Sequence, residues 1–345
     1  MRYEPSLDGL RALAVSVVVL YHFHTPAIRG GWIGVDVFFV LSGYLITSIL
    51  AAEYRRTGTL DLKRFYWFRV LRLAPALFVV LAFVAVLAVR STEHRAEHVY
   101  SIAASALYFM NWNAAFEWGS ASLLGHTWSL SVEEQFYFLW PLIFMGAGKS
   151  RSFAKWTAVA VVGIAAWRIY LNQQGAPWLR TYYAGDTHSE SLFAGCFLAF
   201  VMHSDFVKRA SRYWIIPVVV LPAMAFTMSV KESSAQTWGI SLASIMSAWL
   251  IASLTHDEKL KKLFSHPLMV YTGRISYGWY LWHVPIFLLL KYKIDPAQPL
   301  TLLFYPAMLI GSYMAAVLSY RYVEAPFIAL KKRYPKANRG LVSQA

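Results

Sequence analysis

Three ionisable side chains share one face of the first apolar segment. Asp8, Arg11 and His22 are separated by three and eleven residues, and a helix with about 100° per residue brings them into one narrow sector. Because a charge near the bilayer centre costs about 2.5 to 3.5 kcal/mol on insertion scales, such a stripe needs a reason. It predicts a polar path from Arg11 near the inner surface to His22 near the outer one. The alternative is an Asp8–Arg11 ion pair and an interfacial histidine.

Two carboxylates are candidates to orient this imidazole. Asp36 lies within a strongly apolar run, and Glu133 lies in a polar stretch before the fourth apolar segment. A carboxylate that accepts one imidazole N–H fixes the tautomer and leaves the other ring nitrogen as a base or nucleophile. The alternatives for Asp36 are a pair with another cation or a helix cap. Ser131 and Glu134 have the spacing of a capping box, whereas Glu133 has no such explanation.

Two arginines lie one helical turn apart, at Arg69 and Arg72, so their guanidinium groups share a helix face. Two convergent guanidinium groups are well suited to bind phosphates. The pair therefore predicts a phosphate site at the cytoplasmic mouth of the bundle. The alternative is ordinary anchoring by basic residues on the inner side of the membrane.

Further polar groups interrupt the apolar segments. Tyr277, Tyr280 and His283 recur every three residues in the ninth segment, and His126 precedes the fourth. Tyr280, His283 and His126 could line a substrate site, and hydrogen-bonded packing is the alternative. The segment 94–98 matches the H-x-x-E-H metalloprotease pattern. It is short and hydrophilic, so we interpret the match as chance and expect no metal.

The composition excludes a soluble globular enzyme. Of the 345 residues, 58% are hydrophobic and only 14% are charged, whereas soluble domains carry about 25% charged residues. The formal charge of +14 would suggest a nucleic-acid partner in a soluble protein. Here the positive charge is distributed among loops between apolar segments, and no nucleic acid is expected. The single Cys196 excludes an internal disulfide and a cysteine-based zinc site.

These side chains must be positioned by membrane helices. Apolar stretches of roughly 20 residues predict an all-α polytopic membrane protein with about ten transmembrane helices. Basic loops alternate with less basic ones, which predicts that both termini are cytoplasmic. Residues 1–330 are expected to form one transmembrane domain and residues 331–345 a basic cytoplasmic tail. Val99–Phe116 carries polar residues and is not counted. The predicted spans are centred near Val17, Phe39, Ala82, Leu139, Val161, Phe197, Val219, Ala248, Leu281 and Ile310.

Seven short motifs follow one another along nearly the whole chain. They are Leu7–Ala12, Tyr21–Phe23, Gly34–Ile46, Arg69 with Arg72, Thr127–Tyr137, Ser276–Pro285 and Val323–Phe327. In these motifs and their order the sequence resembles the acyltransferase family 3 membrane proteins of bacteria. Each motif alone is weak, but seven in sequence are a specific match.

The resemblance implies roles for individual residues. The outer-face histidine of the family falls on His22, and its phosphate-binding arginine pair falls on Arg69 and Arg72. Family members are thought to take an acyl group, commonly acetyl, from cytoplasmic acyl-CoA to envelope sugars or other acceptors. Acyl transfer also needs donors that stabilise an oxyanion, and Arg11, Tyr280 and His283 could contribute.

Two hypotheses follow for a multi-pass protein of the bacterial cytoplasmic (inner) membrane. The first is an acetyl-CoA-dependent O-acyltransferase that acts on a hydroxyl of an extracytoplasmic glycan or lipid-linked sugar. His22 would act as a base or as a transient acyl carrier, oriented by Asp36 or Glu133. The second is a transporter or exporter of a small anion that uses the same polar stripe as a translocation path.

Overall fold

The computed structural model describes residues 3–23, 28–90, 94–119, 122–148, 152–291 and 301–334. Within these ranges the chain is helical and contains no strand. The longer helices are α1 (Pro5–His22), α2 (Ile33–Thr57), α3 (Leu62–Arg90), α4 (Arg95–Ala106), α6 (Trp128–Ala147), α7 (Phe153–Gln173), α10 (Glu190–Val201), α12 (Ile215–Thr227), α13 (Ile240–His256), α16 (Ser276–Lys291) and α17 (Thr301–Ser319).

Shorter helical segments connect them. They are α5 (Met110–Phe116), η1 (Ser122–Thr127), α8 (Trp178–Tyr183), α9 (Gly185–His188), α11 (Asp205–Ala210), η2 (Ser211–Tyr213), η3 (Ala235–Gly239), α14 (Glu258–Phe264), α15 (Pro267–Arg274), η4 (Tyr320–Glu324), α18 (Ala325–Ala329) and η5 (Leu330–Arg333). The turn η5 includes both Leu330 and Lys331, between which the boundary of the basic tail was expected.

Each of the ten centres predicted from hydropathy lies in a helix of its own. Among the described residues, four helices are long and apolar enough to cross a membrane: α2, α3, α7 and Ala235–His256. A fifth is possible if Glu190–Val201 and Asp205–Tyr213, bent by 105°, count as one span. At 1.5 Å per residue, helices as short as α10 and α12 reach only about 18 to 20 Å, less than the ~30 Å hydrocarbon core. The uncounted stretch Val99–Phe116 is divided between α4 and α5.

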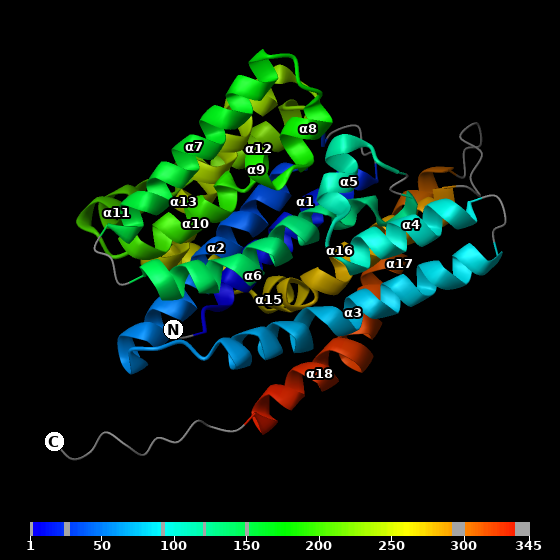
Figure 1. Ribbon diagram of the computed structural model, residues 1–345, viewed down its shortest axis with the longest axis horizontal. Helices are drawn as coiled ribbons and strands as arrows, with labels where there is room; N and C mark the ends of the chain where they lie inside the picture. The colour runs from blue at the N-terminus through cyan, green and yellow to red at the C-terminus, as the bar shows by residue number, and fades with distance from the viewer. Residues whose placement is uncertain are drawn as a thin grey trace.

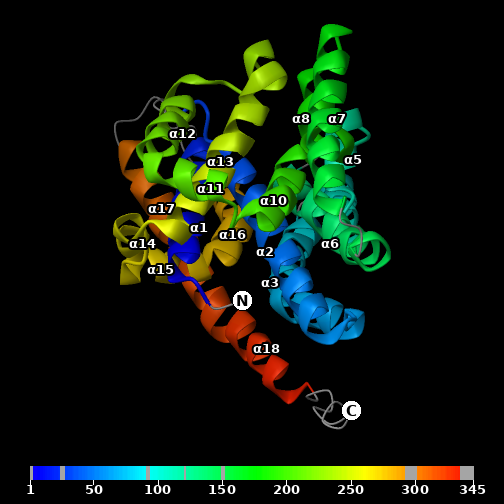
Figure 2. The same cartoon turned by 90° about the vertical axis from the view of Figure 1, so that its left-hand side faces the viewer.

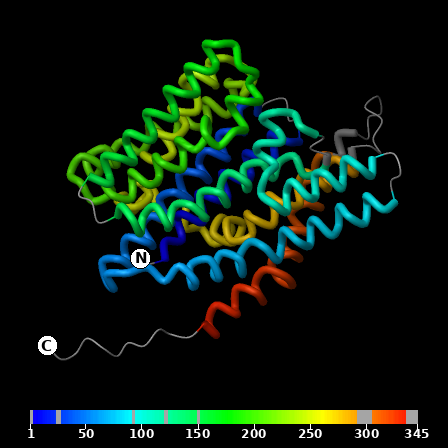
Figure 3. Tube along the Cα trace, viewed as in Figure 1, coloured from blue at the N-terminus to red at the C-terminus, as the bar shows by residue number. Residues whose placement is uncertain are grey.

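The centre of the bundle is formed by α1 and α2 (Figure 1). Of the most apolar stretch of α2, 72% is buried, compared with 11% for α7, which therefore presents its side chains to the surroundings. Figure 2 shows the same central helices between α12 and α14 on one side and α6 and α7 on the other. Figure 3 shows that the beginnings of α1 and α3 lie at one end of the bundle together with α18.

Two glycines allow α2 and α10 to pack backbone against backbone. A Cβ atom on Gly43 would lie 1.9 Å from the carbonyl oxygen of Leu192, and one on Gly195 would lie 2.1 Å from that of Val40. Small residues at helix crossings permit this close approach in membrane bundles. The crossing positions Asp36, in the first turn of α2, against the beginning of α10.

Replacing Gly43 by alanine is expected to destabilise the protein by about 1–3 kcal/mol, because the added methyl group would force the two helices apart. Thermal unfolding in detergent, followed by tryptophan fluorescence, measures this change. The matched control is Gly163→Ala in α7, where a Cβ atom meets nothing within 4 Å and alanine favours the helix by about 0.5–1 kcal/mol. Equal unfolding temperatures for the two variants would contradict the role of this crossing.

Candidate active site

Three histidines from three elements meet near the end of α1. His22 is the last residue of α1, His126 lies in η1 and His283 lies in the middle of α16. The ring of His283 is centred 5.0 Å from that of His22 and 5.2 Å from that of His126. His126 and His283 are buried. The structure thus brings together three of the site residues predicted from the sequence.

Hydrogen bonds to backbone carbonyls define the tautomers of these rings. A carbonyl oxygen only accepts, so Nδ1 of His283 donates to Tyr280 O at 2.5 Å and Nδ1 of His22 donates to Val18 O at 2.9 Å. Nε2 of neutral His283 then accepts from the same Nδ1 of His22, at 3.2 Å. Nε2 of neutral His22 therefore carries a lone pair, as a general base or nucleophile requires.

His126 has the opposite tautomer. Its Nε2 donates to Leu281 O at 3.1 Å, and its buried Nδ1 lacks a hydrogen-bond partner among the described residues. Burial and the neighbouring His22 ring lower the pKa of His126 to about 3, so this ring stays neutral. Its Nδ1 can accept a hydrogen bond from a hydroxyl group.

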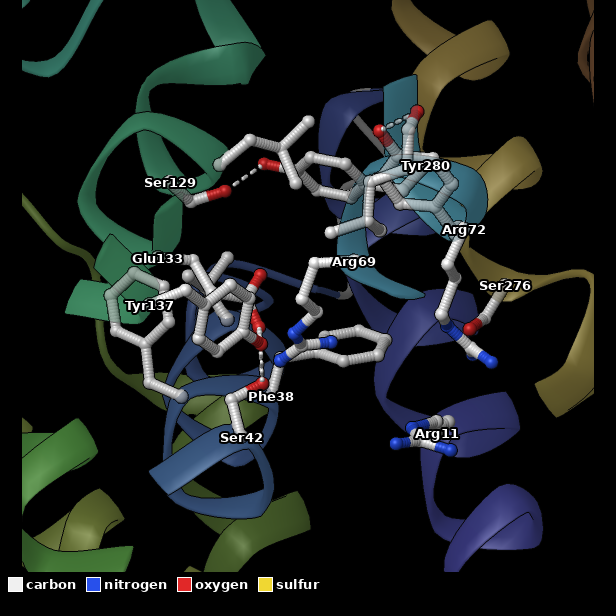
Figure 4. A pocket seen from close by; sticks show the side chains of 15 residues that line it. Arg11, Phe38, Ser42, Arg69, Arg72, Ser129, Glu133, Tyr137, Ser276 and Tyr280 are labelled. Carbon is white, nitrogen blue, oxygen red and sulfur yellow. Dashed lines mark hydrogen bonds between the residues drawn. The ribbon is translucent and has the colours of Figure 1, made fainter. Parts of the chain in front are cut away.

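Tyr280 connects the histidines to a narrow inner cavity. Its hydroxyl donates to His126 O at 2.6 Å and lies 2.6 Å from Ser129 Oγ. The cavity below it measures about 80 Å³, and its lining includes Tyr280, Ser129, Glu133, Ser42, Arg69 and Arg72 (Figure 4). The inner cavity thus ends next to the histidine cluster.

A wider cavity of about 930 Å³ continues from the inner one toward the surface of the bundle, at the end where α1 and α3 begin. We call it the outer cavity because it is the shallower of the two. The two share Arg11, Ser42, Arg69, Arg72 and Tyr137 in their linings. The outer cavity is strongly basic. It is lined by seven cationic side chains, Arg11, Arg64, Arg69, Arg72, Arg274, Lys331 and Lys332, and by two carboxylates, Asp8 and Glu53.

Arg69 and Arg72 are positioned by α3 toward both cavities, as their spacing predicts. The guanidinium of Arg69 lies 3.5 Å from the centre of the Tyr137 ring, and its buried Nε has no hydrogen-bond partner in the described part of the chain. Figure 4 shows Arg11, Arg69 and Arg72 around the same space. Arg11 also forms the expected ion pair with Asp8, at 2.7 Å. The arrangement can bind an anion with several phosphate charges.

The predicted orientation of His22 by Asp36 is not found. Oδ1 of Asp36 accepts hydrogen bonds from His188 Nε2 at 3.0 Å and Ser191 Oγ at 2.6 Å, and all three side chains are buried. The rotation of α2 turns Asp36 toward α9 and α10 and away from the end of α1. Asp36 therefore orients His188, whose Nδ1 donates to Tyr182 O at 2.5 Å.

Glu133 also has partners other than His22. It accepts short hydrogen bonds from Ser42 Oγ and from the hydroxyl of Tyr137, and it lines the inner cavity. The predicted capping box is wrong, because α6 begins at Trp128 and Ser131 lies inside the helix. There its hydroxyl donates to Thr127 O and accepts from Met110 N.

Sequence reasoning missed several residues that line the cavities. Ser42 and Tyr137 hold Glu133, and both fall inside motifs that carried the family resemblance. The separation of Glu133 and Tyr137 by four residues was the available signal, because it places them on one helix face. Lys331 and Lys332 appeared only as part of a basic tail.

Comparison with known proteins identifies the family of the chain. The family described as Acyltransferase domain matches residues 4–321. The chain is 35% identical over 349 residues to the peptidoglycan O-acetyltransferase OatA of Listeria monocytogenes, covering 94% of this chain and 56% of that protein. It is 35% identical over 353 residues to a protein of Staphylococcus aureus strain MSSA476 named as a candidate O-acetyltransferase, covering 95% and 58% of the two chains. No solved structure matches.

The apolar helices of the bundle and the family match together define a membrane protein of the acyltransferase class. The chain belongs to the acyltransferase family whose domain covers residues 4–321, which confirms the resemblance seen in its motifs. It spans a little over half the length of the curated relatives it matches.

Proposed function

We propose that this protein is a membrane-embedded O-acetyltransferase that moves acetyl from cytoplasmic acetyl-CoA to a hydroxyl of an extracytoplasmic glycan. One observation carries the proposal: the basic outer cavity and the narrow inner cavity share their arginines, and the inner one ends at Tyr280 beside the histidine cluster. Phosphates in the first cavity and an acyl group directed toward His22 fit this geometry. The names of the relatives favour peptidoglycan as the acceptor.

In the proposed reaction, the acceptor oxygen forms a bond to the acetyl carbonyl carbon and the carbon–sulfur bond of the thioester breaks. The coenzyme A thiolate leaves, and the proton of the hydroxyl is removed through Nε2 of His22. His22 acts either as this base or as a transient acetyl carrier. In this proposal His126 Nδ1 accepts a hydrogen bond from the acceptor hydroxyl and orients it, while the Tyr280 hydroxyl, which already donates to His126 O, holds His126 in place.

The test uses the protein in proteoliposomes, with acetyl-labelled acetyl-CoA on the side of the basic cavity and a peptidoglycan fragment on the other. We expect alkali-labile acetyl groups on the glycan, together with an equal amount of free coenzyme A thiol. Flux of a small anion without release of thiol would instead support a transporter. Several glycans should be supplied, because the acceptor is inferred only from relatives.

The proposed orientation places about ten spans in the membrane, with the basic end of the bundle in the cytoplasm. That end includes the Lys261–Glu4 ion pair, at 2.9 Å, and the lysines of η5. The opposite end includes the contact of Arg29 with Glu232, at 4.0 Å, beyond the end of α1. This orientation follows the positive-inside rule for a protein of the bacterial inner membrane.

Cysteine labelling tests this orientation. The only native cysteine, Cys196, is buried, so we expect the maleimide not to label the wild-type protein. A membrane-impermeant maleimide added to intact spheroplasts is expected to label Glu232→Cys and to leave Lys262→Cys unlabelled until the cells are opened. Both native side chains lie at exposed positions. The reverse labelling pattern would require the basic cavity to face outward.

A further inference from the structure

The turn after α18 closes one side of the basic outer cavity. Lys331, Lys332 and Tyr334 line this cavity together with the first turns of α3. Nζ of Lys331 lies 5.6 Å from the centre of the Phe68 ring, and the ring of Tyr334 packs edge-on against Phe68 at 5.7 Å. Phe68 therefore attaches this turn to α3 one helical turn away from Arg72.

The cavity holds more cationic than anionic charge. Of its seven cations, Arg11 pairs with Asp8 and Arg64 pairs with Glu53. Within the described residues, the other five have no carboxylate within ion-pair distance, and Arg274 donates to the hydroxyl of Tyr3. Coenzyme A carries about four negative charges on its pyrophosphate and its ribose 3′-phosphate. The excess of cations therefore matches the charge of the proposed donor.

The excess of positive charge in the cavity also affects the pKa of Lys331, which lies beyond the last long apolar helix. Partial burial, followed by the charges of Arg72 and Arg69, lowers the pKa of Lys331 to about 8. A bound phosphate would offset this repulsion. The position of the lysine is thus electrostatically costly without an anion and favourable with one.

The covalent order of coenzyme A assigns its parts to the two ends of the cavity. The pantetheine arm leaves the pyrophosphate on the side opposite the ribose, so an arm that enters the inner cavity places the pyrophosphate at the arginines shared by both cavities. The ribose and its 3′-phosphate then lie farther out. The cations that line only the outer cavity are Arg64, Arg274, Lys331 and Lys332.

We infer that Lys331 and Lys332 bind the ribose 3′-phosphate of the acyl-CoA donor and let the protein distinguish coenzyme A from 3′-dephospho-coenzyme A. This inference rests on the proposed function for the identity of the donor. It adds a specificity site to a segment that the sequence predicted to begin a basic cytoplasmic tail. The pyrophosphate remains with Arg69 and Arg72.

Calorimetric titration of the purified full chain with the two nucleotides tests the inference. The wild type is expected to bind coenzyme A about tenfold or more tightly than the 3′-dephospho form. The Lys331→Gln/Lys332→Gln variant should lose this preference and keep the wild-type affinity for the 3′-dephospho form. Lys331→Arg/Lys332→Arg should restore it, and it also excludes misfolding as the cause.

The control variant is Lys259→Gln/Lys262→Gln, which removes two exposed charges near the same end of the bundle but outside the cavity. It should bind both nucleotides like the wild type. Two results would overturn the inference but keep coenzyme A as a ligand. The wild type could bind the two nucleotides equally tightly, or the Lys331→Gln/Lys332→Gln variant could lose affinity for both nucleotides by the same factor. A wild type that binds neither nucleotide would overturn the proposed donor as well.

Anionic lipid headgroups offer the same phosphate chemistry, so a further arm measures binding of phosphatidylglycerol in mixed micelles. We expect the Lys331→Gln/Lys332→Gln variant to bind this lipid as the wild type does. If it loses affinity for the lipid and keeps its preference for coenzyme A, the lysines bind a headgroup and the inference is wrong.

Discussion

The variant His22→Asn is expected to transfer acetyl about 10²- to 10⁴-fold more slowly than the wild type, which is the usual contribution of a general base. Asparagine can still donate to Val18 O, as Nδ1 of His22 does at 2.9 Å, but it lacks the Nε2 lone pair. The rate of acetyl transfer to glycan in proteoliposomes measures the loss. Affinity for coenzyme A should be unchanged, because His22 is absent from the lining of both cavities.

The control is His203→Asn at an exposed histidine near the end of α10. It should retain full activity. Incubation with labelled acetyl-CoA in the absence of acceptor then separates the two roles of His22: a carrier leaves label on the wild-type protein, whereas a base leaves none. A His22→Asn variant with more than a tenth of the wild-type rate would remove this residue from the chemistry.

A double substitution, Arg69→Gln/Arg72→Gln, is expected to raise the KM for acetyl-CoA by about 10²-fold or more. Each hydrogen bond to a charged group contributes about 1.5–3 kcal/mol, and every 1.4 kcal/mol is tenfold in affinity. Both side chains line both cavities, and Arg11, the third arginine common to the two linings, is already paired with Asp8. Initial rates over a range of acetyl-CoA concentrations measure the effect.

The alternative, that these arginines only anchor the protein, is tested by Arg55→Gln/Arg56→Gln. These two exposed arginines end α2 and line neither cavity. Their removal should leave KM unchanged. If both double variants reduce the amount of protein in the membrane equally and neither changes KM, the phosphate role of Arg69 and Arg72 is wrong.

The helices were predictable from hydropathy, but their rotation was not. The run around Asp36 is apolar on every side, so its periodicity does not indicate which face of α2 meets α1. The structure turns this carboxylate toward His188, which follows 152 residues later. A prediction from spacing works inside one helix, as for Arg69 and Arg72. It fails when two helices must be placed relative to each other.

The contacts within the histidine cluster could not be predicted either. His22 and His283 are 261 residues apart, and each was singled out because it interrupts an apolar segment. No pattern indicated that they touch. Lys331 and Lys332 gave a weaker signal still, since basic residues after a last apolar segment are common anchors. The packing of Tyr334 and Lys331 on Phe68 reveals that this turn returns to the bundle.

The unequal size of the two cavities has a consequence for the use of coenzyme A by the cell. The inner space of about 80 Å³ is less than a tenth of the outer space of about 930 Å³, so the narrow thioester end of the proposed donor suits the inner cavity and its nucleotide suits the outer one. Under the proposed function, this difference in size separates the acetyl group from the coenzyme A that delivers it. That function would export the acetyl group while coenzyme A stays in the cytoplasm, where it can be acetylated again.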